Sequence, residues 1–115
     1  MTVEHLDSGD ILSQATVHNG IVNVCGLTAE DLSLDAKGQT EQILEKIDDR
    51  LAKCGTDKKK LLMATIYLTN MDDKPGMNEA WMTWLGDLER PARACVGAPL
   101  ATPDTLVEIV VSAAK

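Results

Sequence analysis

The stretch RPARACVGAPLATPDTLVEIVVSAA, residues 90–114, decides which fold this 115-residue chain forms. It holds two strand-like runs, residues 92–98 and 105–114, and the two prolines in residues 99–104 mark a loop between them. In the second run a period of two places Val107, Ile109 and Val111 on one side and Leu106 and Val110 on the other. The stretch therefore predicts two strands, the last of them apolar on both faces.

Two charged residues interrupt these strands. Arg93 shares one face of the first run with Cys95 and Gly97. A guanidinium keeps its charge, so its place there is costly unless an anion meets it. Glu108 interrupts the apolar second run, either at a solvated sheet edge or in a pocket. Arg93 and Glu108 are thus either a structural ion pair across neighbouring strands or ligand-binding residues.

A β-hairpin is predicted upstream, in ATVHNGIVNVCG, residues 15–26, because Asn19-Gly20 is a strong signal for a tight turn. Residues 1–6 are predicted as a short first strand. The second strand of the hairpin places Val22 and Val24 on one face and Ile21, Asn23 and Cys25 on the other.

Two amphipathic helices are predicted between the hairpin and the C-terminal strands. In residues 39–54 apolar side chains recur at helical spacing, and Gly55 ends the helix. Residues 61–69 form a buried strand, and Asp72 or Asp73 then caps the second helix. The apolar positions are Ile43, Leu44, Ile47 and Leu51 in the first helix and Met77, Trp81, Trp84, Leu85 and Leu88 in the second.

This order of elements predicts one α+β domain over residues 1–115. Its mixed sheet has about six strands, and both helices cover one face. The chain has no Phe and only 3% aromatic residues, so its core is thin. Because the second sheet face is also partly apolar, we expect the chain to form a homo-oligomer.

Composition argues against nucleic-acid and membrane partners and favours a reducing compartment. A net charge of −7 argues against nucleic-acid binding, and the one basic run, residues 58–60, is predicted to be a solvated loop. Cys25, Cys54 and Cys95 form no CxxC pair, which favours free thiols in a reducing compartment. No signal peptide or membrane-spanning run is recognisable, so we expect a cytoplasmic protein without a membrane partner.

Three stretches resemble segments of one known family. Residues 89–114 resemble the C-terminal signature of the Rid family, the YjgF-like reactive-intermediate imine deaminases: P-A-R-S-C-V, a short loop with L-P, then V-E-I-E-x-x-A. The family segment Y-S-Q-A-V-x-x-G-x-x-x-x-S-G is similar to residues 12–26, LSQATVHNGIVNVCG. The segment T-x-x-x-L-x-D-M-x-D-F-x-x-x-N-x-x-Y is similar to residues 64–81, ATIYLTNMDDKPGMNEAW. The resemblance runs from about residue 11 to the end of the sequence.

The resemblance implies a chorismate-mutase-like α+β fold assembled as a homotrimer, with active sites in clefts between subunits. It implies hydrolysis of 2-imino or enamine acids to 2-oxo acids and ammonia, without a metal or organic cofactor. Arg93 matches the family arginine that holds the substrate carboxylate, as guanidinium geometry allows. Glu108 matches the glutamate that positions the attacking water.

Further positions are carried over from the same family. Cys95 matches the cysteine that lines the pocket through its backbone, and Asn78 the asparagine of the second helix. Trp81 stands where the family often has tyrosine. Cys95 can also be interpreted as a nucleophile whose thiolate Arg93 stabilises, although no histidine lies near it in sequence and a small buried thiol is the commoner role.

Several positions depart from the family pattern. Leu12 stands where deaminase members carry a tyrosine that contacts the site, and Cys25 replaces a serine before Gly26. Leu27 replaces the usual glutamine, and Ala94 replaces a serine. Leu12, Cys25 and Gly26 are still predicted to contact substrate. Such departures are typical of a short, less characterised subgroup, and they leave two alternatives: a trimeric module that binds small carboxylate metabolites or a protein partner, or another reaction in the same cleft, such as a chorismate-type rearrangement.

Overall fold

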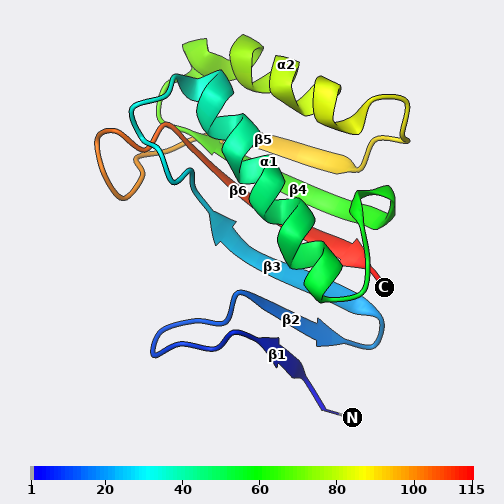
Figure 1. Cartoon of the computed structure of the whole chain (residues 1–115). Coiled ribbons are helices and arrows are strands. Elements are labelled where there is room, and N and C mark those ends of the chain that lie inside the picture. Colours follow the sequence, from blue (N-terminus) through cyan, green and yellow to red (C-terminus); the bar gives the residue numbers. More distant parts are fainter. Residues whose placement is uncertain (1) are drawn as a thin grey trace.

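A single sheet with the strand order β1-β2-β3-β6-β4-β5 organises the computed structural model, which describes residues 2–115 (Figure 1). Its strands are β1 (Glu4–Leu6), β2 (Ala15–His18), β3 (Ile21–Leu27), β4 (Leu61–Leu68), β5 (Ala92–Gly97) and β6 (Val107–Ala114). The helices are α1 (Ala36–Lys53) and α2 (Lys74–Leu85), with short 3-10 turns at Lys58–Lys60 and Met71–Asp73. The sheet is mixed, because β4 runs parallel to β5 and antiparallel to β6. The predicted α+β architecture is confirmed.

The hairpin of β2 and β3 turns where the sequence predicted. Asn19 and Gly20 have φ angles of 51° and 75°, the left-handed pair that a two-residue turn of this kind requires. Val22 and Val24 are buried and Ile21 and Asn23 are exposed, so the predicted faces are confirmed for these residues. Cys25, predicted on the face of Asn23, is instead half-buried against the core, where the register of β3 is irregular. The first strand, predicted over residues 1–6, forms as β1 over Glu4–Leu6 only, and Met1 lies outside the described residues.

Helix α1 begins three residues before the predicted range of 39–54. The Asp35 side chain accepts a hydrogen bond from the Gly38 N–H and caps the helix there, ahead of the apolar periodicity. Gly55, with φ of 80°, follows its end as predicted. The buried face of the helix is Ile43, Leu44, Ile47 and Leu51, with Gln39 and Thr40 at its start.

Entry into helix α2 differs from the prediction. Asp73 occupies the N-cap position but makes no side-chain hydrogen bond. Instead the Asn70 side chain accepts from the Asp72 N–H and caps the preceding 3-10 turn. The basic turn Lys58–Lys60 is also not wholly solvated, because Lys58 Nζ donates to the carbonyl of Trp84 at 2.7 Å and caps the end of α2.

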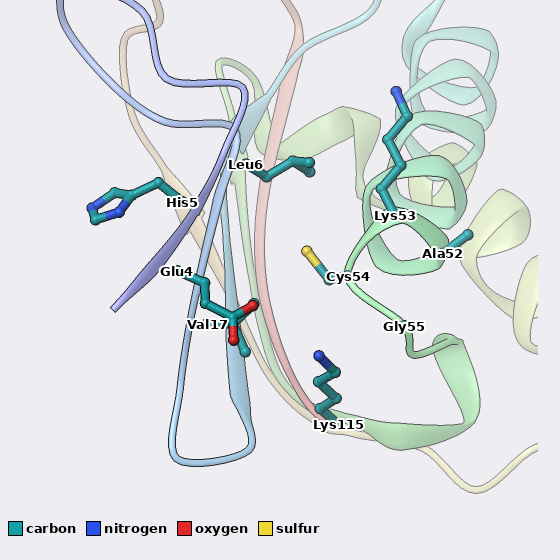
Figure 2. A pocket seen from close by; sticks show the side chains of 9 residues that line it. All are labelled: Glu4, His5, Leu6, Val17, Ala52, Lys53, Cys54, Gly55 and Lys115. Carbon is teal, nitrogen blue, oxygen red and sulfur yellow. The ribbon is translucent and has the colours of Figure 1, made fainter. Parts of the chain in front are cut away.

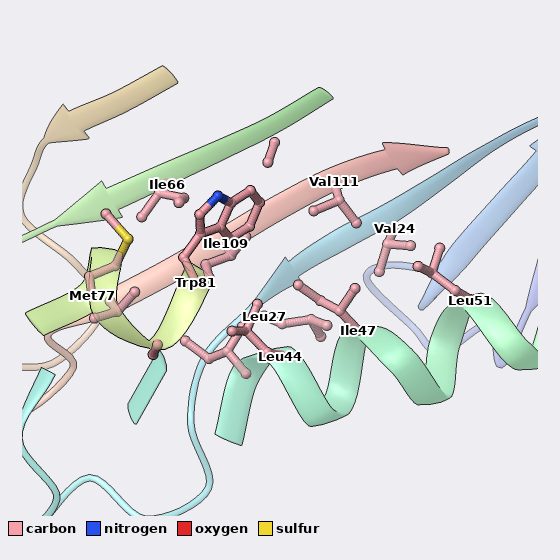
Figure 3. Packing of buried hydrophobic residues seen from close by; sticks show 14 of the residues in the cluster. Val24, Leu27, Leu44, Ile47, Leu51, Ile66, Met77, Trp81, Ile109 and Val111 are labelled. Carbon is pink, nitrogen blue, oxygen red and sulfur yellow. The ribbon is translucent and has the colours of Figure 1, made fainter. Parts of the chain in front are cut away.

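Both helices cover the same face of the sheet, as predicted (Figure 1). Figure 3 shows the core between the layers, where Ile66, Ile109 and Val111 of the sheet meet Ile47 of α1 and Trp81 of α2. Trp84 and Leu88 of the predicted stripe are only half-buried. Within residues 2–115, no helix combines the length and apolar character that crossing a membrane requires.

The other face of the sheet carries apolar side chains without a covering layer. Val96 and Met63 are 42% and 38% exposed, and Val110 is half-buried. Met63 and Val110 alternate along their strands with buried residues that face the helices, and Val96 pairs in register with Tyr67, which lies on the same side as Met63. All three are therefore on the open face. An apolar patch of this kind is typical of a surface that packs against another molecule.

Candidate functional site

Arg93 projects from the edge strand β5 toward helix α2. Its Nη1 donates to Oδ1 of Asn78 at 2.7 Å and lies 3.9 Å from the sulfur of Met77. The guanidinium carbon is 5.7 Å from the centre of the Trp81 ring. Asn78 and Trp81 are neighbours on α2 because residues three apart share a helix face. Arg93 is therefore held by the predicted residues Asn78 and Trp81.

A pocket of about 330 Å³ opens beside this guanidinium. Its lining residues are Asn78, Trp81, Met82, Arg90, Pro91 and Arg93, two cations and no carboxylate. Within residues 2–115 no Asp or Glu oxygen lies within 4.0 Å of an Arg93 nitrogen. A half-buried guanidinium in this setting favours an anionic ligand, above all a planar carboxylate.

Glu108 lies on the open face of the sheet, against the backbone of Gly26. Its neighbours Val107 and Ile109 are fully buried toward the helices, so its half-buried side chain points the other way. A Cβ added at Gly26 would collide with Oε2 of Glu108, so a larger residue there would displace the carboxylate from this position. The register of β3 and β6 is irregular between Val24 and Leu27, which brings this backbone close to Glu108.

Arg93 and Glu108 lie on opposite faces of the sheet. Arg93 pairs in register with Ala64, which is fully buried under the helices, whereas Glu108 pairs with Tyr67 on the other face. Strand β4 also separates their strands. The interpretation of the two as an ion pair on neighbouring strands is therefore wrong, and within one chain they do not face a common ligand.

Cys25 is tied into a small network with residues that the sequence did not single out. Its thiol donates to Oε1 of Gln14 at 3.7 Å, and the same oxygen accepts from Nε of Arg50 at 3.2 Å. Burial raises the pKa of the Cys25 thiol, and nearby Glu108 raises it further, while Arg50 opposes the rise. The thiol is therefore held mainly protonated, as a weak donor beside Gly26 and Glu108.

Leu12 and Cys25 line one pocket of about 570 Å³, between the loop that joins β1 to β2 and the start of the hairpin. Leu12 is 50% exposed and Ile11 94%, so this loop presents two uncovered apolar side chains. Cys95 is half-buried against the core, on the same face of β5 as Arg93. Within residues 2–115 no three His, Cys, Asp or Glu side chains converge as metal ligands do.

The predicted site residues thus fall into two groups. One group, Arg93, Asn78, Trp81 and Cys95, lies at the β5 edge under α2. The other, Leu12, Cys25, Gly26 and Glu108, lies around β3 and the open face. Sequence reasoning did not single out Gln14, Arg50 or Arg90. Gln14 stands within the family-like segment of residues 12–26, whereas the contact of Arg50 with Gln14 depends on helix packing that no local pattern encodes.

A family model for endoribonuclease L-PSP matches residues 3–115. The chain belongs to the endoribonuclease L-PSP family. A RutC family protein of Haemophilus ducreyi is 44% identical over 112 residues, which cover 97% of this chain and 96% of that protein. A protein of Acinetobacter baylyi named 3-aminoacrylate deaminase RutC is 35% identical over 101 residues, covering 83% and 79%.

The structures of the endoribonuclease L-PSP family extend this match to the fold. The crystal structure of a YjgF family member from Neisseria meningitidis superposes with a TM-score of 0.96 at 39% identity, and covers 100% of this chain and 96% of that one. The resemblance of residues 89–114 to the Rid, or YjgF-like, family is therefore confirmed, and so is the YjgF-like fold.

Proposed function

We propose that this protein hydrolyses reactive 2-imino and enamine acids to 2-oxo acids and ammonia. The observation that carries the proposal is the half-buried Arg93 guanidinium, fixed by Asn78 at 2.7 Å and without a carboxylate partner in the described chain. The name of the Acinetobacter relative, a deaminase of the enamine acid 3-aminoacrylate, supports the same class of substrate.

Arg93 holds the substrate by its carboxylate. Nη1 donates one N–H to Asn78 and one to the sulfur of Met77, which leaves three of the five guanidinium donors for an anion. Trp81 lies against the guanidinium and limits its rotation. Anchoring the carboxylate places the neighbouring imine carbon at a fixed distance from Arg93, and this fixed geometry lowers the entropic part of the barrier.

Glu108 positions water and accepts its proton. The water oxygen bonds to the carbon of the protonated imine, and Glu108 takes one proton from that water. The hydroxyl proton of the tetrahedral adduct then moves to nitrogen, and the C–N bond breaks as the C=O bond of the 2-oxo acid forms. Ammonia leaves, and Glu108 returns its proton to water. No electron is exchanged with a second reactant, so the reaction needs no redox cofactor. The half-buried setting of Glu108 beside Gly26 supports this role.

The complete site is assembled by two subunits of a homotrimer. Arg93 and Glu108 occupy opposite faces of one sheet, so one substrate meets both only when the second group comes from a neighbour. We assign Arg93, Asn78 and Trp81 to one subunit and Glu108, Gly26 and Cys25 to the next. The exposed Val96 and Met63 on the open face support packing of that face between subunits. The free thiols support a cytoplasmic location.

An imine-trapping assay tests the proposal. An amino-acid oxidase generates 2-iminopropionate in the presence of semicarbazide, and formation of the semicarbazone reports the imine that escapes hydrolysis. The wild type and Lys59→Gln, an exposed surface change, are expected to suppress trapping equally. Arg93→Gln is expected to lose most of that effect. If neither the wild type nor Arg93→Gln suppresses semicarbazone formation from any of a panel of imino and enamine acids, the proposal is refuted.

A second candidate function is capture of small carboxylates without turnover. Leu12 replaces the tyrosine of deaminase members, and the Cys25 thiol is kept protonated by burial, so neither of these two side chains supplies acid or base chemistry. Under this alternative, 2-oxo acids raise the Tm of the wild type but not of Arg93→Gln, and no product forms in the trapping assay.

A further inference from the structure

A second cavity, of about 430 Å³, lies between the C-terminal end of α1 and the strands β1 and β2. Figure 2 shows it from close by, with the Cys54 sulfur directed toward Leu6 and with His5 turned away. Its lining residues are Glu4, His5, Leu6, Val17, Ala52, Lys53, Cys54, Gly55 and Lys115. Its volume is in the range of pockets that hold small molecules.

The cavity exists because the helix layer is narrower than the sheet. Helix α1 packs on β3 and β6, whereas β1 and β2 continue the sheet beyond it (Figure 1). Glu4 pairs in register with Val17, and Leu6 with the buried Ala15, so Glu4, Leu6 and Val17 all face the side of the helices. Leu6 and Val17 therefore form an apolar floor that α1 only partly covers.

Two residues of opposite charge, Glu4 and Lys115, line the rim of the cavity. Within residues 2–115 no oxygen of Glu4 lies within 4.0 Å of the Lys115 nitrogen. Burial raises the pKa of the Cys54 thiol most. Of the two charged residues, Lys115 lowers this pKa and Glu4 raises it. The other cation of the rim, Lys53, already pairs with Asp49 at 3.2 Å. The cavity thus offers one carboxylate, one ammonium and an apolar floor.

We propose that this cavity binds a small α-amino acid with an apolar side chain. The ammonium of the ligand pairs with Glu4, its carboxylate with Lys115, and its side chain covers Leu6, Val17 and the thiol of Cys54. A molecule with only one of the two charges leaves one rim residue without a partner. A zwitterion without a side chain leaves the apolar floor exposed to water.

This site is separate from the pocket beside Arg93. The cavity lies at the β1 edge of the sheet, and Arg93 lies on β5 at the other edge. The two pockets share no lining residue. Binding of an amino acid in the cavity therefore does not depend on the proposed deaminase function, and Arg93→Gln distinguishes the two.

L-leucine is the probe for the first experiment. Its dissociation constant is measured by calorimetry, and its position is reported by mass spectrometry as the rate at which iodoacetamide alkylates Cys54. Glycine, 4-methylpentanoate and 3-methylbutylamine serve as ligands that lack the side chain, the ammonium or the carboxylate. The variants are Glu4→Gln and Lys115→Gln, two exposed residues, with Lys59→Gln as the matched surface control.

We expect L-leucine to slow alkylation of Cys54 in the wild type, in Lys59→Gln and in Arg93→Gln alike. Glu4→Gln and Lys115→Gln should each raise its Kd by about fivefold, the upper range for an exposed ion pair, and the three partial ligands should bind more weakly than leucine. Absence of protection at Cys54, unchanged affinity in both rim variants, or loss of leucine binding in Arg93→Gln overturns the proposal.

Discussion

The side-chain amide of Asn78 accepts a hydrogen bond from Arg93 at 2.7 Å, and this contact ties helix α2 to the edge strand β5. The partner is a neutral amide, so the guanidinium is oriented while its charge is left for a ligand. A carboxylate at the same place would orient Arg93 and neutralise it as well. The residue type at position 78 therefore bears directly on anion binding.

Asn78→Asp tests this relationship with almost no change of shape. We expect the new carboxylate to form a charge-assisted pair with Arg93 and to compete with the substrate carboxylate, raising KM by about tenfold or more. Asn78→Ala should raise KM less, because the guanidinium is loosened but not neutralised. Steady-state kinetics on 2-iminopropionate measure both, with Glu79→Gln, an exposed neighbour on α2, as control. Equal KM values for Asn78→Asp and wild type contradict the role given to Asn78.

Mixed trimers test whether Arg93 and Glu108 of one site come from different subunits. Arg93→Gln and Glu108→Gln should each be inactive alone. When the two variants are unfolded together and refolded, random mixing gives about a quarter of the sites an intact Arg93 and an intact Glu108 from neighbouring subunits, so about a quarter of wild-type activity should return. If both residues of a site belong to one chain, no mixture regains activity.

Gly26→Ala tests the close approach of Glu108 to the backbone of β3. The added Cβ meets Oε2 of Glu108, so we expect the carboxylate to be displaced and activity to fall by about tenfold or more. In the background of Glu108→Ala the same substitution should cost little stability, since the colliding group is absent. Urea unfolding and the imine-trapping assay measure the two effects. Gly76→Ala, whose Cβ makes only ordinary contact with Lys37, is the control.

The fold was largely predictable because its signals are local. Asn19-Gly20 predicted the turn of the hairpin correctly, and the spacing of Ile43, Ile47 and Leu51 predicted the first helix. The errors lie at element ends: α1 starts at Ala36 because the Asp35 cap precedes the apolar pattern. Ends depend on single hydrogen bonds, which periodicity does not report.

The candidate site was only partly predictable. The alternation of β5 and β6 assigns each residue to one of two faces, but it does not say which face of one strand matches which face of the other. How the faces of β5 and β6 match depends on the strand order. The position of β4 between β6 and β5 is a feature of the tertiary structure that local sequence patterns do not report. For this reason Arg93 and Glu108 were predicted to be neighbours, and the structure places them on opposite faces.

Gln39 shows a buried polar contact that holds the loops around the sheet. It is fully buried, and its Nε2 donates to the carbonyls of Leu34 and Asp104 at 3.0 Å, while its Oε1 accepts from the Leu106 N–H at 3.0 Å. Gln39→Leu leaves these backbone groups without partners and should lower the free energy of unfolding by about 3 kcal/mol. Gln42→Leu, one turn along α1, loses one exposed contact and should cost less than about 1 kcal/mol. Similar losses for the two variants in urea titrations contradict this account.

The pH dependence of Cys25 reports the charges around it. Burial raises the pKa of its thiol above the ordinary 9.0, Glu108 raises it further, and Arg50 lowers it. The rate of alkylation of Cys25 by iodoacetamide, followed by mass spectrometry, should therefore reach half its maximum above pH 9.0. This midpoint should move upward in Arg50→Gln and downward in Glu108→Gln.

The same pKa shift has a consequence for stability. Because the folded protein holds the thiol proton more tightly than the unfolded chain, the stabilisation is complete below the unfolded pKa and is lost as pH rises through the folded pKa. Cys25→Ala should therefore remove part of the decline in stability above pH 9.0 and leave its pH dependence below pH 8 unchanged, a value about one unit under the unfolded pKa. The alkylation midpoints of Arg50→Gln and Glu108→Gln should move in opposite directions, because a cation and an anion act on a thiolate with opposite sign. Midpoints that move in the same direction contradict the placement of Cys25 near both Arg50 and Glu108.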